Sequence, residues 1–383
     1  VTTTYNTAVG DKAGQANQTG TNNTFIGTEA GLSVTTGAKN TFVGAEAGDG
    51  TDDGANNVAV GYQALSVNCA SGNTAVGYQS GLILTGTENV LIGNVAGTAL
   101  TDADQTIAIG SGALLTDAKG DGSVAVGTSA LQSQSFSSVT TTGNTAVGHK
   151  AGKFLSTGLS NTFIGMEAGQ GITGTRITGN NNTCVGKASG SLLQGSAAGN
   201  TLIGTSAGDG ITTAIDCIMI GSSAGSGQVT TTNDQLYIAR SNAALGNDPV
   251  FLYGNSAGEL VNGANSSTFS TVSDERIKKN IVDSPKGLAE ILQVKIRNFE
   301  YRTFDELDDD VKALNNGKGL NVLNKSGVRT GVIAQELETI FPNDVNDLPD
   351  GTKNVKIENT QWALIKAVQE LSAKNDALEA RIA

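Results

Sequence analysis

The pentapeptide Asn-Thr-Ala-Val-Gly at residues 6–10 returns many times in this chain of 383 residues. Close copies begin at Asn23, Asn40, Asn73, Asn144, Asn161 and Asn200. With the looser copies between them, the closing glycines stand at positions 10, 27, 44, 61, 77, 93, 110, 127, 148, 165, 186, 204 and 221. Thirteen copies spaced by 16 to 21 residues, most often by 17, predict a solenoid of stacked coils and not one globular core.

The three residues after the asparagine predict one short β-strand per copy. The second position of the copy is Thr, Val or Ile throughout, and the fourth is Val or Ile. Two β-branched residues spaced by two lie on the same face of a strand. The third position is Ala, Phe, Leu, Cys or Met, so the opposite face is apolar as well. We therefore expect strands buried on both faces, as in a packed or oligomeric solenoid.

The rest of each copy predicts tight turns and a ladder of asparagines. The closing Gly ends the strand, and a small residue three positions later, usually Ala before Gly, allows backbones to approach closely. Asn opens ten of the thirteen copies. Stacking would align these amides so that each bonds to the next, which is a scaffold role and not a ligand site. With a rise of about 4.8 Å per coil, the rod would be roughly 60 Å long.

The pattern N-T-A-V-G-x-x-A-G resembles the head repeat of trimeric autotransporter adhesins, over about residues 6–225. The resemblance implies a parallel β-roll that trimerises. Those heads usually have a slightly shorter repeat with Ser after the Asn, and this chain departs from both features.

Composition excludes several classes of function. The net charge of −12 argues against binding to nucleic acid or anionic lipid, both of which require basic surfaces. There is no run of 18 apolar residues, so we expect no membrane insertion, and we expect no signal peptide in residues 1–383. We expect no cofactor and no metal.

The cysteines and the single histidine do not form a recognisable site. Cys69, Cys184 and Cys217 are odd in number and widely spaced, so we expect three free thiols. His149 follows a closing glycine and is expected at the surface. One histidine per chain excludes a Ser-His-Asp triad or a His-based zinc site within that chain.

Acidic residues recur in the turns without matching a known calcium loop. We expect solvated turns at Asp49, Asp52, Asp53, Asp117 and Asp121. Glutamates at one position of the repeat predict a surface ladder, formed by Glu29, Glu46 and Glu167. Glycosidases need two placed carboxylates and usually aromatic platforms, so catalysis on an external glycan is not expected.

Three regions follow from the sequence: a solenoid over 1–225, a β-rich neck over 226–272 and a small α+β domain over 273–383. In the neck we expect strands at 235–239 and 250–253. In the last region we expect a helix over 285–294, a strand over 296–301, and a segment over 331–340 that begins extended and becomes helical before Pro342. The ranges 303–326 and 343–354 are predicted to be charged loops.

The last residues carry a regular heptad pattern, which predicts a coiled coil over 357–383. The residues on this heptad face, spaced alternately by 4 and 3, are Ile357, Gln361, Leu364, Val368, Leu371, Asn375, Leu378 and Ile382. A polar residue such as Asn375 at the centre of a coiled coil fixes register and oligomer number. The alternative is an amphipathic helix that packs on its own domain.

The string S-D-E-R-I-K-K-N-I at 273–281 is the sharpest motif in the chain. With G-V-I-A-Q-E-L-E-T-I-F-P at 331–342 and the C-terminal helix, it resembles the intramolecular chaperone domain of phage endosialidases and related tail fibres. The resemblance covers about residues 273–383. It implies a domain that trimerises its parent chain and then cuts itself off.

The resemblance also assigns roles to residues of the string. Ser273 would be the nucleophile that attacks the carbonyl of Val272, and Lys278 would be its general base. A serine hydroxyl needs an adjacent base, and a lysine can act as one only when burial or nearby cations lower its pKa. Arg276 is a nearby cation that would help, and Asp274 would orient the site or stabilise the lysine charge.

By resemblance alone, Gln335 and Glu336 would complete the pocket. The cut between Val272 and Ser273 would be a single turnover, so at most the chain is a Ser-Lys autoprotease without an external substrate. The alternative is that the string only folds and that no cut occurs.

These features predict an extracellular homotrimeric fibre of structural and adhesive function. It would be a phage tail fibre or receptor-binding protein, or the fibre of a contractile injection system. Its partners would be copies of itself, a host cell-surface receptor (glycan or protein), and a baseplate or upstream fibre part at the N-terminal end. The alternative is a trimeric adhesin on a bacterial cell surface that keeps its chaperone domain attached.

Overall fold

The computed structural model describes residues 4–226, 231–239, 250–254, 256, 260–262, 275–309, 312, 327–348 and 351–382. The chain divides into two compact units, Val1–Phe269 and Ser270–Ala383, and each is described here by itself. Within the described ranges, no helix is both long enough and apolar enough to cross a membrane.

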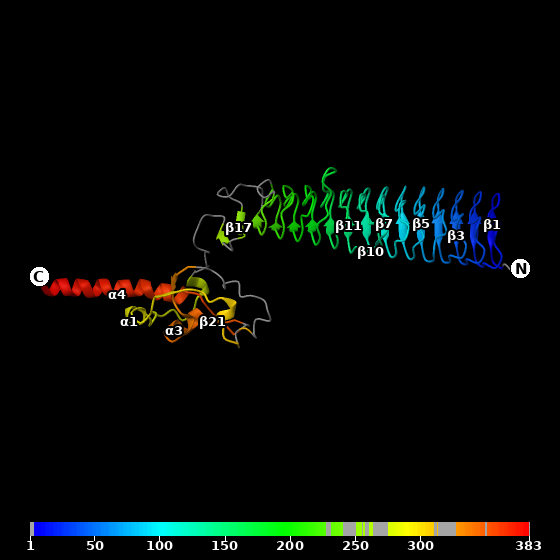
Figure 1. Cartoon of the computed structure of the whole chain (residues 1–383). Coiled ribbons are helices and arrows are strands. Elements are labelled where there is room, and N and C mark those ends of the chain that lie inside the picture. Colours follow the sequence, from blue (N-terminus) through cyan, green and yellow to red (C-terminus); the bar gives the residue numbers. More distant parts are fainter. Residues whose placement is uncertain are drawn as a thin grey trace. The chain divides into compact units, whose positions relative to one another are not determined.

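The described part of the first unit contains one three-residue strand for each of the thirteen copies, stacked side by side (Figure 1). The strands are β1 Thr7–Val9, β2 Thr24–Ile26, β3 Thr41–Val43, β4 Val58–Val60, β5 Thr74–Val76, β6 Val90–Ile92, β7 Ile107–Ile109, β9 Val124–Val126, β11 Thr145–Val147, β12 Thr162–Ile164, β13 Thr183–Val185, β14 Thr201–Ile203 and β15 Ile218–Ile220. They pair in parallel, and equivalent residues stand opposite each other, as Phe25 does with Phe42. The predicted parallel β-solenoid is confirmed.

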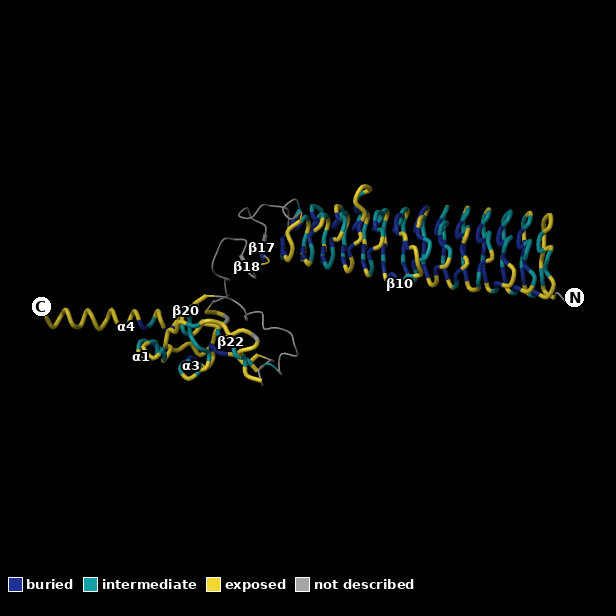
Figure 2. Tube along the Cα trace, in the orientation of Figure 1, coloured by how far each residue is buried: buried dark blue, intermediate teal, exposed yellow. Residues whose placement is uncertain are grey.

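The middle residue of each strand fills the inside of its coil. From the second coil onward these side chains are buried, including Phe25, Phe42 and Phe163. Figure 2 shows buried stretches of chain recurring from coil to coil. The closing glycines allow the coils to stack, since a Cβ on Gly27 would lie 2.4 Å from the carbonyl oxygen of Gly44. Most of the small residues after them are buried too, as Ala30 is.

The expectation that the strands are buried on both faces is wrong for the single chain. A coil encloses only one face of its strand, so the β-branched second and fourth positions point outward. Ile26 and Ile164 are each 40% exposed. The fourth-position residues form what we call the outer apolar row: Val9, Ile26, Val43, Val60, Val76, Ile92, Ile109, Val126, Val147, Ile164, Val185, Ile203 and Ile220.

The asparagine ladder is present and has a definite geometry. The backbone N–H of Asn40 donates to Oδ1 of Asn23 at 2.8 Å, and Nδ2 of Asn40 donates to the carbonyl oxygen of Gly54 at 2.8 Å. Direct bonds between amides occur as well, as from Nδ2 of Asn182 to Oδ1 of Asn161 at 3.0 Å. These buried amides serve the backbone, in agreement with a scaffold role.

The ladder changes where Thr106 and Ser123 replace asparagine, and a buried polar group lies there. Nε2 of Gln134 donates to Oδ2 of Asp117 at 2.5 Å and to Oγ of Ser123 at 2.7 Å. The solvated turn predicted at Asp117 is wrong, because this carboxyl is fully buried among hydrogen-bond donors. Burial raises its pKa above the ordinary value. Two short strands flank the group, β8 Gly120–Asp121 and β10 Thr140–Thr141, which pair in parallel.

Three further strands follow the last coil. Strand β16 Leu236–Ala239 pairs in parallel with β15, and β17 Val250–Gly254 and β18 Leu260–Asn262 add antiparallel strands. The strands expected at 235–239 and 250–253 are confirmed. The region predicted as a neck therefore begins with a strand that continues the solenoid sheet.

The second unit is small and mixed. Its elements are η1 Glu275–Ile277, α1 Leu288–Ile291, β19 Arg297–Phe299, η2 Phe304–Glu306, β20 Arg329–Gly331, α3 Ala334–Glu338, η3 Pro342–Asp344, β21 Val345–Asp347, β22 Lys353–Val355 and α4 Glu358–Ile382. Strand β19 pairs antiparallel with β20, and β21 with β22. A compact core forms around Leu337, Phe341 and Ala363.

The structure confirms some of the elements predicted for this unit and corrects others. The strand in 296–301 and the extended-to-helical change in 331–340 are confirmed by β19, β20 and α3. The helix expected over 285–294 is limited to Leu288–Ile291. The loop predicted over 343–354 is wrong, because β21 and β22 form a hairpin there.

Candidate functional site

The predicted nucleophile and the bond it would attack are not placed. Val272, Ser273 and Asp274 lie outside the described residues. The first described residues of the S-D-E-R-I-K-K-N-I string form η1. The backbone N–H of Lys278, directly after it, donates to the carbonyl oxygen of Glu275 at 3.1 Å. The side chains of Lys278 and Arg276 are exposed in the single chain. A lysine acts as a general base only when desolvation or neighbouring cations favour its neutral form. The single chain does not bury Lys278, so its desolvation would have to come from contacts that this chain alone does not make.

Glu336 is held in a two-pronged ion pair. Nη2 of Arg297 lies 2.6 Å from its Oε1, and Nε of Arg297 donates to its Oε2 at 3.1 Å. This hydrogen bonding by Arg297 is the main reason that the pKa of Glu336 lies below its usual range. A carboxylate held ionised in this way cannot supply a proton at neutral pH, so its geometry suits a positioning role.

Gln335 and Glu336 border a shallow hollow of about 650 Å³ on α3. The hollow is bounded by two segments, 292–295 after α1 and 335–340 on and after α3. Gln335 and Glu336 are neighbours in the sequence and both line this hollow, whereas Lys278 is not among the described residues that line it.

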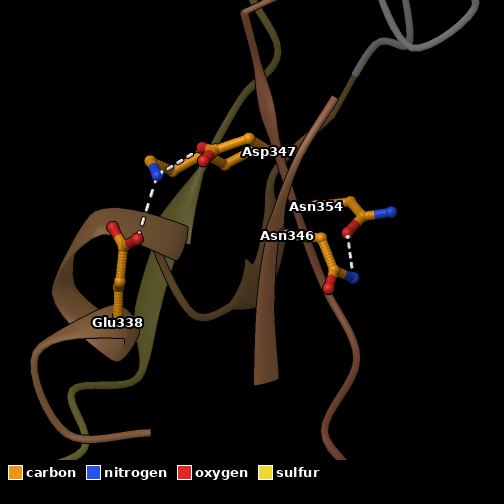
Figure 3. A network of polar contacts seen from close by, with 5 residues as sticks. Glu338, Asn346, Asp347 and Asn354 are labelled. Atoms are coloured by element: carbon orange, nitrogen blue, oxygen red, sulfur yellow. Dashed lines mark hydrogen bonds and ion pairs between the residues drawn. The ribbon is translucent and has the colours of Figure 1, made fainter. Parts of the chain in front are cut away.

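A lysine ties the β21–β22 hairpin to α3. Nζ of Lys353 donates to Oδ1 of Asp347 at 2.6 Å and to Oε1 of Glu338 at 3.0 Å (Figure 3). Hydrogen bonds to Asp347 first, and then to Glu338, raise the pKa of Lys353. The sequence signal for this hairpin was the turn triplet Pro-Asp-Gly at 349–351, between Val345 and Val355.

Asp344 holds the beginning of α4. Its Oδ1 accepts the backbone N–H of Asn359 at 3.0 Å, and its Oδ2 accepts the N–H and the hydroxyl of Thr360 at 2.7 and 2.6 Å. A carboxylate at the first turn satisfies free N–H groups and favours the helix dipole. Burial raises the pKa of Asp344, but the hydrogen bonds from Thr360 and Asn359 outweigh burial and lower it overall. Sequence reasoning missed this residue because it lies fourteen positions before the helix.

The helix α4 is present as predicted, and its heptad face is open. Ala363 and Ala367 are the buried residues of this helix. The apolar residues of the heptad face are all exposed in the single chain, Leu371 for example by 57%. The face that packs on the domain is therefore not the heptad face.

The structure also shows the environments of the three cysteines, the single histidine and the repeated glutamates. Cys69, Cys184 and Cys217 are buried and unpaired, which confirms the expectation of free thiols. His149 is exposed after its glycine. The glutamate ladder pairs between coils, with Glu29 2.6 Å from Nζ of Lys12.

Comparison with known proteins bears on the second unit. Residues 273–346 match the family described as chaperone of endosialidase. Comparisons with curated proteins and with solved structures found no match to this chain. The matched segment begins at Ser273, the predicted nucleophile, and ends within β21. The chain therefore combines a parallel β-solenoid with a segment similar to the chaperone of endosialidase.

Proposed function

We propose that this chain forms a homotrimeric fibre of structural and adhesive function, and that its C-terminal domain is an intramolecular chaperone for trimerisation. The observation that carries the proposal is the outer apolar row, a line of Val and Ile that runs along all thirteen described coils without a partner in the single chain. Long apolar surfaces of this kind mark interaction sites, since burial stabilises by about 25 cal/mol per Å².

Copies of the same chain are the partners that fit this surface. The row is repetitive, and an equally repetitive surface matches it coil by coil. The heptad face of α4 is also open and apolar, so both units present a surface for self-association. The similarity of residues 273–346 to the chaperone of endosialidase supports the same reading.

A solenoid of near-identical coils has a specific need for a chaperone. A slip by one coil between chains changes local contacts little, so misaligned trimers are a kinetic trap. A C-terminal domain that associates first would align the three chains before the coils pair. Its later removal would make unfolding slow, because the nucleus is gone.

The chemistry of removal follows from the residues of the string. Ser273 Oγ would attack the carbonyl carbon of Val272 while Lys278 takes the hydroxyl proton. The peptide nitrogen of Ser273 would leave as an amine, and water would hydrolyse the resulting ester. The products would be residues 1–272 with a new carboxylate and 273–383 with a new N-terminus. Since Lys278 is exposed in the single chain and a lysine base needs desolvation, cleavage would follow an assembly step that would bury it.

We place the fibre outside the cell, on a phage tail or a contractile injection system. It would contact a host surface glycan or protein and join a baseplate or upstream fibre part at its N-terminal end. The second candidate is a trimeric adhesin on a bacterial surface that keeps its chaperone domain, which the head-repeat pattern favours. Tail genes beside the coding gene would support the first candidate, and secretion genes the second.

The test of the fibre is the oligomeric mass of the full-length chain in solution. We expect a trimer for the wild type, and loss of trimer for the double variant Ile164→Glu/Ile203→Glu, which places charges on the outer apolar row. Thr205→Glu, exposed two residues away, is the matched control and should remain trimeric. A monomeric wild type, or a trimer that the double variant leaves intact, would contradict the proposal.

The test of cleavage is a denaturing gel with intact mass for wild type and Ser273→Ala. We expect fragments 1–272 and 273–383 from the wild type and a whole chain from the variant. If both stay whole, Ser273 and Lys278 do not form a working pair, and the domain is a permanent part of the fibre.

A further inference from the structure

The buried polar group of the eighth coil contains a hydroxyl in contact with a side-chain amide. We propose that Ser123 and Gln134 become joined there by an ester bond, formed between Oγ of the serine and the side-chain carbonyl carbon of the glutamine with release of ammonia. The bond is a covalent staple inside one coil. It concerns the first unit alone, so it is independent of the proposed trimer and of cleavage before Ser273.

The two reacting groups are close together. Oγ of Ser123 lies 2.7 Å from Nε2 of Gln134. The amide carbon Cδ is one bond of about 1.33 Å from this nitrogen, so it lies within about 4 Å of the hydroxyl oxygen. The last torsion of a glutamine side chain has a broad minimum. A modest rotation therefore turns the face of the amide toward the hydroxyl and brings the reacting atoms to the distance of about 3–3.5 Å from which attack starts.

The hydroxyl of Ser123 is oriented for attack by Thr142. The two hydroxyl oxygens lie 2.6 Å apart. The hydroxyl of Thr142 donates to the carbonyl oxygen of Asp121 at 2.9 Å, so its own lone pairs are free to accept the proton of Ser123. Oγ of Ser123 then directs its lone pairs toward Gln134, which is the orientation that a nucleophile requires.

The amide of Gln134 is bonded at both ends by groups that favour its cleavage. Nδ2 of Asn144 donates to Oε1 of Gln134 at 3.0 Å, where it stabilises the negative charge that attack places on this oxygen. At the other end, Oδ2 of Asp117 lies 2.5 Å from Nε2, the nitrogen that leaves. Burial raises the pKa of Asp117, so its carboxyl keeps a proton in a pH range where an exposed carboxyl has lost it. A protonated carboxyl in this place is a general acid for the leaving nitrogen.

The reaction conserves atoms and needs no second reactant. The bond from Oγ of Ser123 to Cδ of Gln134 forms, and the bond from Cδ to Nε2 breaks. Nε2 receives the hydroxyl proton of Ser123, relayed by the carboxyl of Asp117, which ends unchanged. The nitrogen leaves as ammonia, which becomes ammonium and is diluted in water, so the reverse reaction does not compete.

The position of the cluster in the solenoid protects the ester and gives it a use. Asp117, Ser123, Gln134 and Asn144 are fully buried, and the exclusion of water prevents hydrolysis of the ester. In this part of the rod Ser123 replaces the ladder asparagine, and 21 residues separate the closing glycines at 127 and 148. A covalent loop from 123 to 134 restricts the unfolded chain where the regular ladder is interrupted.

The test is the intact mass of the denatured full chain carrying Ser273→Ala, so that cleavage does not change the mass. We expect a mass lower by one ammonia than the sequence gives, and the full sequence mass when Ser123→Ala is added. Ser133→Ala, which alters a buried serine next to Gln134, is the matched control and should retain the loss. A chain with the full sequence mass would overturn the ester, and so would a loss that persists with Ser123→Ala.

A peptide map locates the bond and does not depend on whether the variant folds. Trypsin releases residues 120–150 as one peptide, because no Lys or Arg lies between Lys119 and Lys150. We expect this peptide to lack one ammonia and to give no fragments from backbone cleavage between Ser123 and Gln134, since the ring holds the pieces together. Hydroxylamine, which cleaves esters, should restore these fragments. Fragments from within the ring before this treatment would refute the proposal.

Discussion

The backbone N–H of Asn73 lies 2.8 Å from Oδ1 of Asn57, and Nδ2 of Asn57 lies 2.8 Å from the carbonyl oxygen of Ala70. One buried side chain thus satisfies a donor in the next coil and an acceptor in its own. The same arrangement recurs along the ladder, as at Asn40 and Asn23, so the buried amides connect successive coils.

Asn57→Ala should therefore destabilise the solenoid strongly. The substitution leaves the buried N–H of Asn73 unpaired, which costs about 1–3 kcal/mol, and removes one of the two donors to the carbonyl oxygen of Ala70, which keeps the bond from Nδ2 of Asn73. We expect the free energy of unfolding to fall by about 1–3 kcal/mol, measured by denaturant unfolding followed by circular dichroism. The exposed Asn94→Ala is the control and should change it by less than about 0.5 kcal/mol. Equal effects of the two substitutions would show that the ladder is not a main source of stability.

Gly61→Ala should disturb the stacking of two coils. A Cβ at this position would lie 2.3 Å from the carbonyl oxygen of Gly77, and the φ of +137° is disfavoured for any residue with a side chain. We expect a loss of about 3 kcal/mol of stability in the same unfolding measurement. Gly174→Ala, where a Cβ has open space around it, is the matched control. A variant at Gly61 as stable as that control would contradict the close packing of the glycine column.

Asp117→Asn should change how the solenoid responds to pH. Burial raises the pKa of Asp117, so the folded chain holds this proton more tightly than the unfolded chain does. The stabilisation is complete below the ordinary value, near 4, and is lost as the pH rises through the folded value. We expect thermal midpoints of the wild type to fall between pH 4 and pH 7 relative to those of Asp117→Asn. The exposed Asp102→Asn should follow the wild type, and parallel profiles for wild type and Asp117→Asn would refute the assignment.

Asp344→Asn should have the opposite pH signature in the second unit. The pKa of Asp344 is lowered, so its stabilisation is present above the ordinary value and is lost as the pH falls through the folded value. We expect the helical signal of α4 to melt about 5 °C lower at pH 7 in the variant, with the difference shrinking as the pH falls below the ordinary carboxyl value near 4. Asp376→Asn, exposed on the same helix, is the control. A difference that persists in acid would mean that charge is not the cause.

The repeat made the solenoid predictable because its signal is redundant. Thirteen copies contain the same strand and closing glycine, and ten of them begin with asparagine, so no single substitution hides the period. The direction of the strand faces was not predictable in the same way. Both faces of a strand such as Thr41–Val43 are apolar, and only the closed coil decides that Phe42 points inward and that Val43 points out.

The other features that the sequence did not predict depend on contacts between residues that are far apart in the chain. Asp117 stands in a turn like the other acidic residues, and its burial depends on Gln134, seventeen residues later. Asp344 caps a helix that begins fourteen residues after it. In the candidate site, helix α3 was predicted from the sequence. The ion pair between Glu336 and Arg297 was not predicted, because these residues are 39 positions apart. Such contacts are properties of the folded chain and leave no periodic trace in the sequence.

The parallel register of equivalent residues has a genetic consequence. Since each coil presents the same bonding groups above and below, as Phe25 and Phe42 or Thr162 and Thr183 illustrate, deletion of one whole copy joins two surfaces that already match. Unequal recombination between copies in the gene can therefore shorten or lengthen the rod by whole coils, about 4.8 Å at a time. Selection can therefore adjust the length of the solenoid in steps of one coil without changing the structure of the individual coils.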